Sequence, residues 1–237
     1  MKIATFSDIH GNLQALKTIL EDIKKRNVDE VICLGDVIGL GPNSDECLDL
    51  ILKDNIIFLM GNHELYYTKG LDVGYIVNPE ILVHNEWVHN NIHHDFDDSK
   101  LTHEIDINNK KLLFVHYFLK DNFKSDEYPF ESSSLFETDD YKKLFDKYPY
   151  DYVFYGHRHE ERIDSNGKTT FYGLESSGCT KGDITSYYLI DTNNFNIERI
   201  DLKYDRKLFE NIMENIDFPN KDHICDYFYG LKKVKKS

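Results

Sequence analysis

Apolar segments of two periodicities alternate over the first 60 residues of the chain. Residues 2–7 form a short apolar run that predicts a buried strand, and residues 12–26 repeat their apolar positions at helical spacing. A second run predicts a strand at 30–36, a helical pattern surrounds residues 47–51, and a third run predicts a strand at 56–63. Strands that alternate with helices in this way predict a parallel sheet covered by helices.

The pattern changes after a predicted helix at residues 79–94. Strand-like segments now follow one another, and several are joined by turn sequences such as Ser-Asn-Gly. The predicted strands are 102–107, 111–116, 151–156, 160–164, 169–174, 185–191 and 196–202. We therefore expect one α/β domain, a four-layer sandwich of two mixed β-sheets flanked by helices.

Two segments lie outside this strand pattern. Residues 119–138 are rich in Asp, Glu, Ser and Lys, and we expect a mobile loop of the kind that often determines specificity. Residues 205–216 have a helical pattern, and the last residues of the chain are basic. We expect residues 1–204 to form the main domain and residues 205–237 to add a helical extension and a frayed basic tail to it.

Polar side chains recur where the predicted strands end. Five apolar runs lead into the sequences DIH, GD, GNHE, VH and GHRH. Ligands of open α/β sheets bind beyond the carboxyl ends of the strands, so we expect these side chains to meet there. The candidate site residues are Asp8, His10, Asp36, Asn62, His63, His116, His157 and His159.

The residue types in this set favour a metal site. Carboxylate, imidazole and amide donors suit Mn, Fe, Zn, Co or Ni, and the set contains no thiolate. Alternate residues of an extended segment share a face, which orients Asp8 with His10 and His157 with His159. Taken alone, Asp8 and His10 fit a helix-capping turn equally well, but the recurrence of such residues at other strand ends favours the metal site.

The composition narrows the classes of protein and partner. The chain has 237 residues, 41% of them hydrophobic, which is enough for one sizeable core. Its formal net charge of -14 opposes binding to duplex nucleic acid, so a phosphate-bearing substrate needs local positive charge such as bound metal ions. No apolar run is long enough to cross a membrane, and the cysteines lack metal-binding or redox spacing, so we expect a cytoplasmic protein.

The sequences at the strand ends resemble those of the calcineurin-like metallophosphoesterase superfamily. The series DIH, GD, GNHE, VH and GHRH appears here in the family's order, and GDVIGLGP at 35–42 resembles the small bacterial and archaeal phosphodiesterase branch. The resemblance covers nearly the whole chain. It implies the metallophosphoesterase fold and a phosphoesterase that depends on two metal ions.

The resemblance also implies how the site residues divide between the two ions. Asp36 would bridge them, together with a water or hydroxide that attacks phosphorus, and His63 would stay unligated and face the leaving group as the catalytic residue. Manganese is the favoured ion, with iron, zinc, nickel and cobalt as alternatives. The remaining ligands would be Asp8, His10 and His159 for the first ion, and Asn62, His116 and His157 for the second.

The expected activity is the hydrolysis of small phosphodiesters, so the expected partner is a small phosphate-ester substrate. Two alternatives within the family are a phosphomonoesterase and a dinucleoside polyphosphate hydrolase. A non-catalytic binding scaffold is the alternative from another class, because a retromer subunit shares this fold. The presence of every expected ligand, and of His63, favours the enzyme. A tyrosine-rich surface is also compatible with a homo-oligomer.

Two sequences depart from the family pattern. Many relatives have GDxVDRG, whose second acid orients the histidine and whose arginine meets phosphate, whereas GDVIGLGP offers neither group at that place. Relatives of the small branch often have HGSP where this chain has HYFL at 116–119. We expect Tyr117 and Phe118 to narrow or reshape the entrance of the site.

Structural roles are the favoured interpretation for several other side chains. Asn12 is expected to cap a helix or support the site, and Glu64 to support the site or start a helix. Trp87 is expected in the core. The histidines of the 79–94 helix are expected on its solvated face, although one pair has metal-binding spacing: His84, His89, His93 and His94. Some aromatic side chains are more often packing residues than the lining of a base-binding pocket: Tyr66, Tyr67, Tyr117, Phe118 and Phe123.

Overall fold

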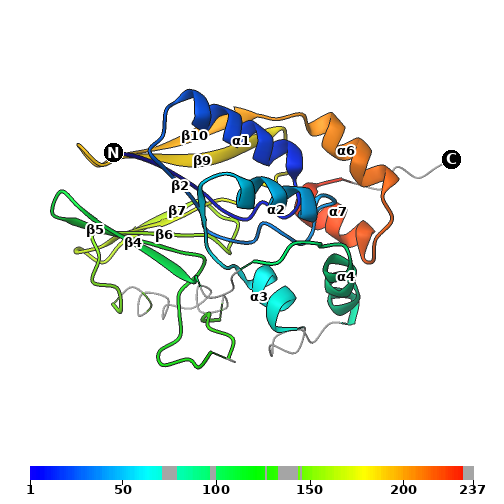
Figure 1. Cartoon of the computed structure of the whole chain (residues 1–237), viewed down its shortest axis with the longest axis horizontal. Helices are drawn as coiled ribbons and strands as arrows, with labels where there is room; N and C mark the ends of the chain where they lie inside the picture. The colour runs from blue at the N-terminus through cyan, green and yellow to red at the C-terminus, as the bar shows by residue number, and fades with distance from the viewer. Residues whose placement is uncertain (71–78, 97–99, 126, 133–143, 145, 232–237) are drawn as a thin grey trace.

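Two five-stranded β-sheets stack on each other in the computed structural model (Figure 1). The model describes residues 1–70, 79–96, 100–125, 127–132, 144 and 146–231. The first sheet has the strand order β10-β9-β1-β2-β3, formed by β1 (Lys2–Phe6), β2 (Glu30–Cys33), β3 (Ile56–Phe58), β9 (Ile184–Asp191) and β10 (Asn196–Lys203). The second has the order β4-β5-β6-β8-β7, formed by β4 (Thr102–Ile107), β5 (Lys110–Val115), β6 (Tyr152–Tyr155), β7 (Arg162–Ser165) and β8 (Thr170–Gly173).

Both sheets are mixed, as predicted. In the first, β1, β2 and β3 run parallel, while β9 pairs antiparallel with both β1 and β10. In the second, β5, β6 and β8 run parallel, with antiparallel β4 and β7 at the two edges. The carboxyl ends of β1, β2 and β3 therefore lie at one edge of their sheet, which is where α/β sheets bind ligands.

Alternation along the strands gives each sheet an inner and an outer apolar face. Ile3 of β1 and Phe114 of β5 belong to the cluster between the two sheets. Their neighbours Ala4 and Val115 belong to separate outer clusters. Because successive side chains of a strand point to opposite faces, a strand that is buried on both sides needs apolar residues at every position. This requirement explains the continuous apolar runs in the sequence.

Helices cover the outer face of the first sheet and one end of the sandwich (Figure 1). On the outer face, α1 (Leu13–Lys25) and α2 (Ser44–Lys53) bury Leu16, Ile19 and Leu48 in the cluster that also contains Ala4. Four more helices are described: α3 (Asn62–Lys69), α4 (Pro79–Asn90), α6 (Arg206–Asn215) and α7 (Lys221–Tyr229). The predicted α/β sandwich is confirmed.

The C-terminal helices pack against the rest of the chain. Phe209 of α6 and Tyr229 of α7 are buried in one cluster with Ala15 of α1 and Leu40. The guanidinium of Arg206 donates hydrogen bonds to the carbonyl oxygens of Tyr229 and Thr180, 2.5 Å each. Through these contacts α6 and α7 pack against the segment that contains α1, and the assignment of residues 205–237 to the same domain stays a prediction. Residues 232–237 of the predicted basic tail lie outside the described residues.

Several predictions for individual segments differ from the structure, including the second strand, which ends at Cys33 rather than at residue 36. The third strand ends at Phe58 rather than continuing to residue 63, because the Glu64 carboxylate accepts the Gly61 N–H (2.9 Å) and α3 begins at Asn62. The helix predicted at 79–94 ends at Asn90. In the predicted 119–138 loop, Tyr128 and Phe130 are buried, whereas residues 126 and 133–138 lie outside the described residues.

The described helices of the structure differ from membrane-spanning helices in length and hydropathy. Among the described residues, no helix combines the length and the apolar character that a bilayer span requires.

Candidate metal centre

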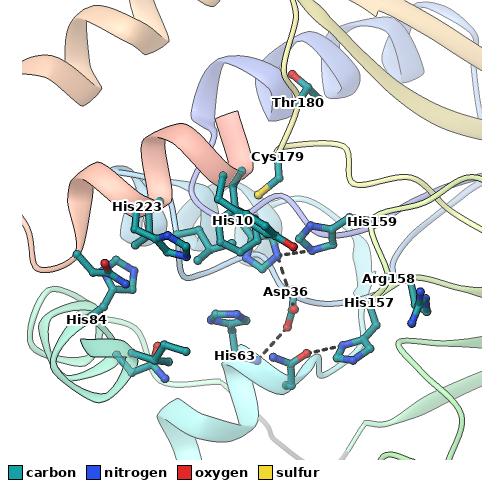
Figure 2. Close-up of a pocket in the computed structure, with 18 of the residues that line it drawn as sticks. His10, Asp36, His63, His84, His157, Arg158, His159, Cys179, Thr180 and His223 are labelled. Carbon is teal, nitrogen blue, oxygen red and sulfur yellow. Dashed lines mark hydrogen bonds and ion pairs between the residues drawn. The ribbon is translucent and has the colours of Figure 1, made fainter. Parts of the chain in front are cut away.

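Strand ends position the eight candidate residues around one centre, and Figure 2 labels five of them: His10, Asp36, His63, His157 and His159. Asp8 and His10 follow β1, and Asp36 follows β2. His116 comes directly after β5. Asn62 and His63 begin α3, and His157 and His159 lie in the loop after β6. The structure therefore brings all eight residues to the same edge of the sandwich.

The backbone between β1 and α1 is locked to the backbone after β2. Asp8 N–H donates to Gly35 O (3.0 Å), and His10 N–H donates to Asp36 O (2.9 Å). Several candidate residues also hold a left-handed backbone, which side chains other than glycine rarely adopt. Those with positive φ are Asp8 (57°), His10 (46°), Asp36 (52°), His157 (71°) and His159 (57°). Such strain concentrates at functional sites, where surrounding contacts hold it in place.

A first group of donors consists of Asp8, His10 and His159. The Nε2 atoms of His10 and His159 lie 3.0 Å apart, and Asp8 Oδ1 lies 3.3 Å from His159 Nε2 and 3.8 Å from His10 Nε2. His10 Nδ1 lies 3.1 Å from the Ile38 carbonyl. Because a carbonyl only accepts, Nδ1 carries the proton and the neutral ring presents its Nε2 lone pair to the site.

A second group consists of Asn62, His116 and His157. Asn62 Oδ1 lies 3.1 Å from His116 Nε2 and 2.8 Å from His157 Nδ1. His116 Nδ1 lies 3.0 Å from the Leu34 carbonyl, so this ring also presents its Nε2 lone pair to the site. Two of the imidazoles are thus fixed in the tautomer that a metal ligand requires.

Asp36 lies between the two groups. Its Oδ2 is 3.7 Å from His10 Nε2 and 3.5 Å from His116 Nε2. Its Oδ1 accepts the backbone N–H of His63 (2.9 Å), which fixes the orientation of the carboxylate. A Cβ atom on Gly61 would lie 2.1 Å from that same oxygen, so only glycine fits where α3 passes the carboxylate.

Glu64 holds the backbone of the centre in place through hydrogen bonds. Its buried carboxylate accepts the backbone N–H groups of Asp36, Val37 and Gly61 at 2.7–2.9 Å. Asn12 is the N-cap of α1, because its Oδ1 accepts the Ala15 N–H (3.1 Å). The supporting and capping roles predicted for Glu64 and Asn12 are confirmed.

Burial and mutual repulsion shift the acidic groups of the centre. Burial, together with the Glu64 and Asp8 carboxylates, raises the pKa of Asp36 well above its usual value. Burial also raises the pKa of Glu64 to about 7. For Asp8 burial acts in the same direction, but the neighbouring His159 lowers its pKa below the usual value. Crowded carboxylates of this kind favour a bound cation.

Burial keeps three imidazoles of the centre neutral. It is the main cause that lowers the pKa of His116 to about 4, and those of His63 and His157 to about 3. Neutral imidazole is the form that coordinates metal ions. The centre therefore offers neutral nitrogen donors around buried carboxylate oxygens at pH 7.

His63 is held by packing on its Nδ1 side. A Cβ atom on Gly39 would lie 2.4 Å from His63 Nδ1, so the ring lies directly against the Gly39 backbone. The rings of His10 and Tyr66 flank it, with centroids 4.8 and 5.8 Å away. The sequence GDVIGLGP offers no acid to orient this histidine, and close packing takes the place of that contact.

Cys179 is a neighbour of the centre that the sequence did not indicate. Its sulfur lies within 4.8 Å of ligand atoms of His10 and His159. Burial raises the pKa of the Cys179 thiol, which lies 3.6 Å from the Tyr229 hydroxyl. The donor set predicted from the sequence contains no thiolate, so we leave Cys179 out of it.

Two interpretations of side chains outside the donor set are wrong. Tyr117 and Phe118 do not narrow the entrance, because both are fully buried in the outer cluster of the second sheet, and Tyr117 packs behind His157 with ring centroids 4.5 Å apart. His84 does not lie on a solvated helix face, because it is buried between Trp87 and Phe218. Trp87 packs against two core clusters, as predicted.

A cavity of about 1020 Å³ opens beside the centre. His10, Asp36, Asn62, His63, His157 and His159 form its floor. The helical wall, as we call the side formed by α4 and α7, contributes Ile81, His84, Asn85, His223, Ile224, Tyr227 and Phe228. Only α4 of this wall was predicted from periodicity, and its pocket residues were not identified.

Comparisons with known proteins give a family for this chain and proteins of similar fold. Residues 1–194 match the model of the calcineurin-like phosphoesterase superfamily domain. An uncharacterised protein of Methanocaldococcus jannaschii is 30% identical over 236 residues, which cover 90% of this chain and 92% of that protein. The crystal structure of a metallophosphoesterase from Sphaerobacter thermophilus is 16% identical, with a TM-score of 0.62 over 92% of this chain and 95% of the other.

A second known protein matches a shorter part of the chain. A symmetrical bis(5'-nucleosyl)-tetraphosphatase from Psychromonas ingrahamii is 30% identical over 98 residues, which are 40% of this chain and 29% of that protein.

Proposed function

Because the chain belongs to the calcineurin-like phosphoesterase superfamily, we propose that it hydrolyses small phosphodiesters at a centre of two metal ions. The position of Asp36 carries the proposal. Its Oδ2 lies between His10 Nε2 of the first donor group (3.7 Å) and His116 Nε2 of the second (3.5 Å). A carboxylate shared by two groups of nitrogen and oxygen donors suits a pair of ions better than a single ion.

The donor atoms fit such ions in charge and in hydrogen bonding. Asp8 Oδ1 is buried and accepts no hydrogen bond from a described residue. An unsatisfied buried oxygen is unfavourable, and a cation would satisfy it. The neutral rings of His10 and His116 aim their Nε2 lone pairs at the same space. We assign Asp8, His10 and His159 to the first ion, Asn62, His116 and His157 to the second, and Asp36 to both.

The ions, when bound, would lower the pKa of a shared water and neutralise phosphoryl oxygens. The donor set suits manganese, with iron, zinc, nickel or cobalt as alternatives. The protein's own part is to hold the donors in fixed orientations, through the strained strand-end loops and the Glu64 carboxylate. This rigidity keeps the donors close together despite the repulsion between their charges.

His63 acts on the leaving group. Its Nδ1 side lies against Gly39, so its Nε2 side faces the cavity that the ring lines. A neutral imidazole carries one N–H, and this group can donate to the oxygen that leaves phosphorus. Because proton transfer from a neutral ring would leave an imidazolate, His63 acts by hydrogen bonding to the negative charge that develops on this oxygen, and such contributions are about 10²–10⁴-fold in rate.

A dinucleoside polyphosphate hydrolase is the second candidate function. The partial similarity to a bis(5'-nucleosyl)-tetraphosphatase and the cavity of about 1020 Å³ favour it over a phosphomonoesterase, which needs less space. The measured order of substrates would separate these activities.

The test is a substrate panel with metal-loaded protein. We expect manganese-loaded wild type to hydrolyse bis(p-nitrophenyl) phosphate faster than p-nitrophenyl phosphate or diadenosine tetraphosphate. Asp36→Asn should lower the rate more than about 100-fold, because the amide lacks the negative charge and the second oxygen of the shared carboxylate. Asp49→Asn, at an exposed ion pair with Lys53 on α2, is the matched control and should be unaffected. Faster cleavage of diadenosine tetraphosphate would favour the second candidate, and cleavage of no ester by loaded protein would favour a binding scaffold.

A further inference from the structure

Two neighbouring residues of α4, His84 and Asn85, line the cavity, and each has a buried polar atom without a hydrogen-bond partner among the described residues. Their side chains are 3% and 7% exposed, and both line the cavity beside the metal centre. His84 Nε2 and Asn85 Nδ2 form no hydrogen bond with any described residue. A buried polar atom without a hydrogen-bond partner lowers the stability of the fold by about 1–3 kcal/mol. Two such atoms on adjacent residues therefore require an explanation. A bound ligand that pairs with both atoms provides one.

The two atoms have opposite hydrogen-bonding character. His84 Nδ1 lies 3.1 Å from the Pro219 carbonyl, which only accepts, so Nδ1 carries a proton. Burial lowers the pKa of His84 to about 4, so the ring is neutral at pH 7 and Nε2 keeps its lone pair. Asn85 Nδ2 is a donor. The helical wall therefore offers one acceptor and one donor from adjacent residues.

Aromatic rings of α7 complete the same wall. Tyr227 is 63% exposed and stacks on His223, with ring centroids 5.5 Å apart and planes 18° apart. Phe228 packs edge-on against Tyr227 (4.9 Å). In Figure 2, His84 and His223 lie on one side of the site, and His157 and Arg158 lie on the other. A planar ligand that stacks on these exposed rings would be beside the unsatisfied atoms of α4.

Charge at the cavity favours a neutral group in this position. Glu160 and Glu175 line the cavity along with Lys181 and Arg158. Arg199 pairs with Glu175 (2.6 Å), and Arg158 lies 3.7 Å from Glu160. Mixed charges do not form a second phosphate site. Among the described residues that line the cavity, the helical wall itself contributes no Lys, Arg, Asp or Glu, so it suits a neutral planar group better than a further phosphoryl group.

From this arrangement we propose that the helical wall is a nucleobase subsite, and that the substrate of the proposed phosphodiesterase carries a nucleoside. Its phosphate would be at the metal centre, its base would stack on Tyr227 and His223, and the base edge would pair with His84 Nε2 and Asn85 Nδ2. Base edges place donors and acceptors side by side, whereas simple aryl or alkyl esters do not. The cavity of about 1020 Å³ is large enough for a nucleotide. The phosphate position rests on the proposed function, and the base contacts do not.

The experiment measures adenosine binding separately from hydrolysis. Adenosine is titrated into wild type and variants by calorimetry, and KM is measured for the dinucleotide adenylyl-(3'→5')-adenosine and for bis(p-nitrophenyl) phosphate. His84→Asn keeps a donor for the Pro219 carbonyl and removes the acceptor at Nε2, and Asn85→Asp replaces the donor with an acceptor. His89→Asn, on the exposed side of the same helix, is the matched control.

Both variants should weaken adenosine binding and raise KM for the dinucleotide by roughly three- to tenfold, the effect of one lost hydrogen bond. Values of KM for bis(p-nitrophenyl) phosphate should change less than about twofold. If thermal melting shows that an α4 variant is unfolded, Tyr227→Ala at the exposed ring gives the same test. It should weaken adenosine binding by about fivefold or more, through lost stacking.

The outcomes separate the two proposals. The nucleobase subsite is wrong if wild type cleaves bis(p-nitrophenyl) phosphate but does not bind adenosine at millimolar concentration. It is also wrong if each variant changes KM for the dinucleotide and KM for bis(p-nitrophenyl) phosphate by the same factor. If adenosine binds in a manner that depends on His84 and Asn85 while no ester is cleaved, the subsite stands and the proposed hydrolysis is wrong.

Discussion

The floor and the helical wall of the cavity are built in opposite ways. The floor comes from loops at the ends of β1, β2, β5 and β6, with positive φ at residues such as Asp8 and His157 and with most polar atoms engaged. The wall comes from two regular helices, α4 and α7, whose polar atoms at His84 and Asn85 are unsatisfied. The floor belongs to the region that matches the family model, residues 1–194, whereas α7 lies beyond it.

This difference shows how one molecule separates chemistry from recognition. A site that must hold like charges together needs a rigid backbone, and the floor obtains it from strain, backbone hydrogen bonds and the buried Glu64 carboxylate. A wall that only selects a leaving group can be made of helices with exposed rings such as Tyr227. Substitutions in the floor should therefore change the rate or the fold, and substitutions in the wall should change substrate preference.

The largest effect on the floor is expected from His63→Ala. Its side chain lines the cavity, and we assign it to the leaving group rather than to a metal ion. The turnover number for bis(p-nitrophenyl) phosphate should fall by about 10²–10⁴-fold. Metal content, measured by inductively coupled plasma mass spectrometry, should stay as in wild type. The exposed His93→Ala is the control, and loss of metal together with rate would make His63 a ligand instead.

A smaller effect is expected from Glu64→Gln, which tests the rigidity of the floor. An amide has one acceptor oxygen, so its NH₂ group would face either the N–H groups of Asp36 and Gly61, which now donate to Oε2, or those of Val37 and Ile38, which now donate to Oε1. The free energy of unfolding of metal-free protein should fall by roughly 2–3 kcal/mol in urea denaturation. Glu46→Gln, on the exposed side of α2, should leave it unchanged. Equal stability of Glu64→Gln and wild type would show that Glu64 does not hold these loops.

The last predicted effect concerns the wall and is a dependence of stability on pH. The pKa of His84 is about 4 in the folded chain and about 6.5 when unfolded, so between these values only the unfolded chain binds the proton. The unfolding free energy of metal-free wild type, minus that of His84→Asn, should therefore be flat above pH 6.5. Below that it should fall by about 1.4 kcal/mol per pH unit down to pH 4. A difference that is constant between pH 7.5 and 4.5 would contradict the buried, neutral state of His84.

The sequence predicted the floor better than the wall for a physical reason. The residues Asp8, Asp36 and His116 follow apolar runs, and parallel strands bring their carboxyl ends together, so local pattern was enough to predict that they meet. Their binding of metal stays a prediction. His84 looked like a surface residue, because the residues that bury it, Phe218 and Pro219, lie more than 130 positions away in the chain.

Two further predictions also differ from the structure. Tyr117 follows the candidate ligand His116 by one position, yet its ring is buried behind His157, since the chain turns into the core after β5. The apolar run that ends at Met60 looked like one strand to residue 63, but the Glu64 carboxylate starts α3 at Asn62. For Tyr117 a contact between distant segments decided the outcome, and such contacts leave no periodic signal; for the third strand the decisive contact is local, between residues three positions apart.

The most direct test of the central claim is the number of metal ions that the floor binds. Metal-free wild type is titrated with manganese in a calorimeter, and the metal content of the loaded chain is measured after gel filtration. The account predicts two ions per chain for wild type and for Asp49→Asn, and fewer than two for Asp36→Asn. Binding of a single ion by wild type, or an equal content in wild type and Asp36→Asn, would contradict it.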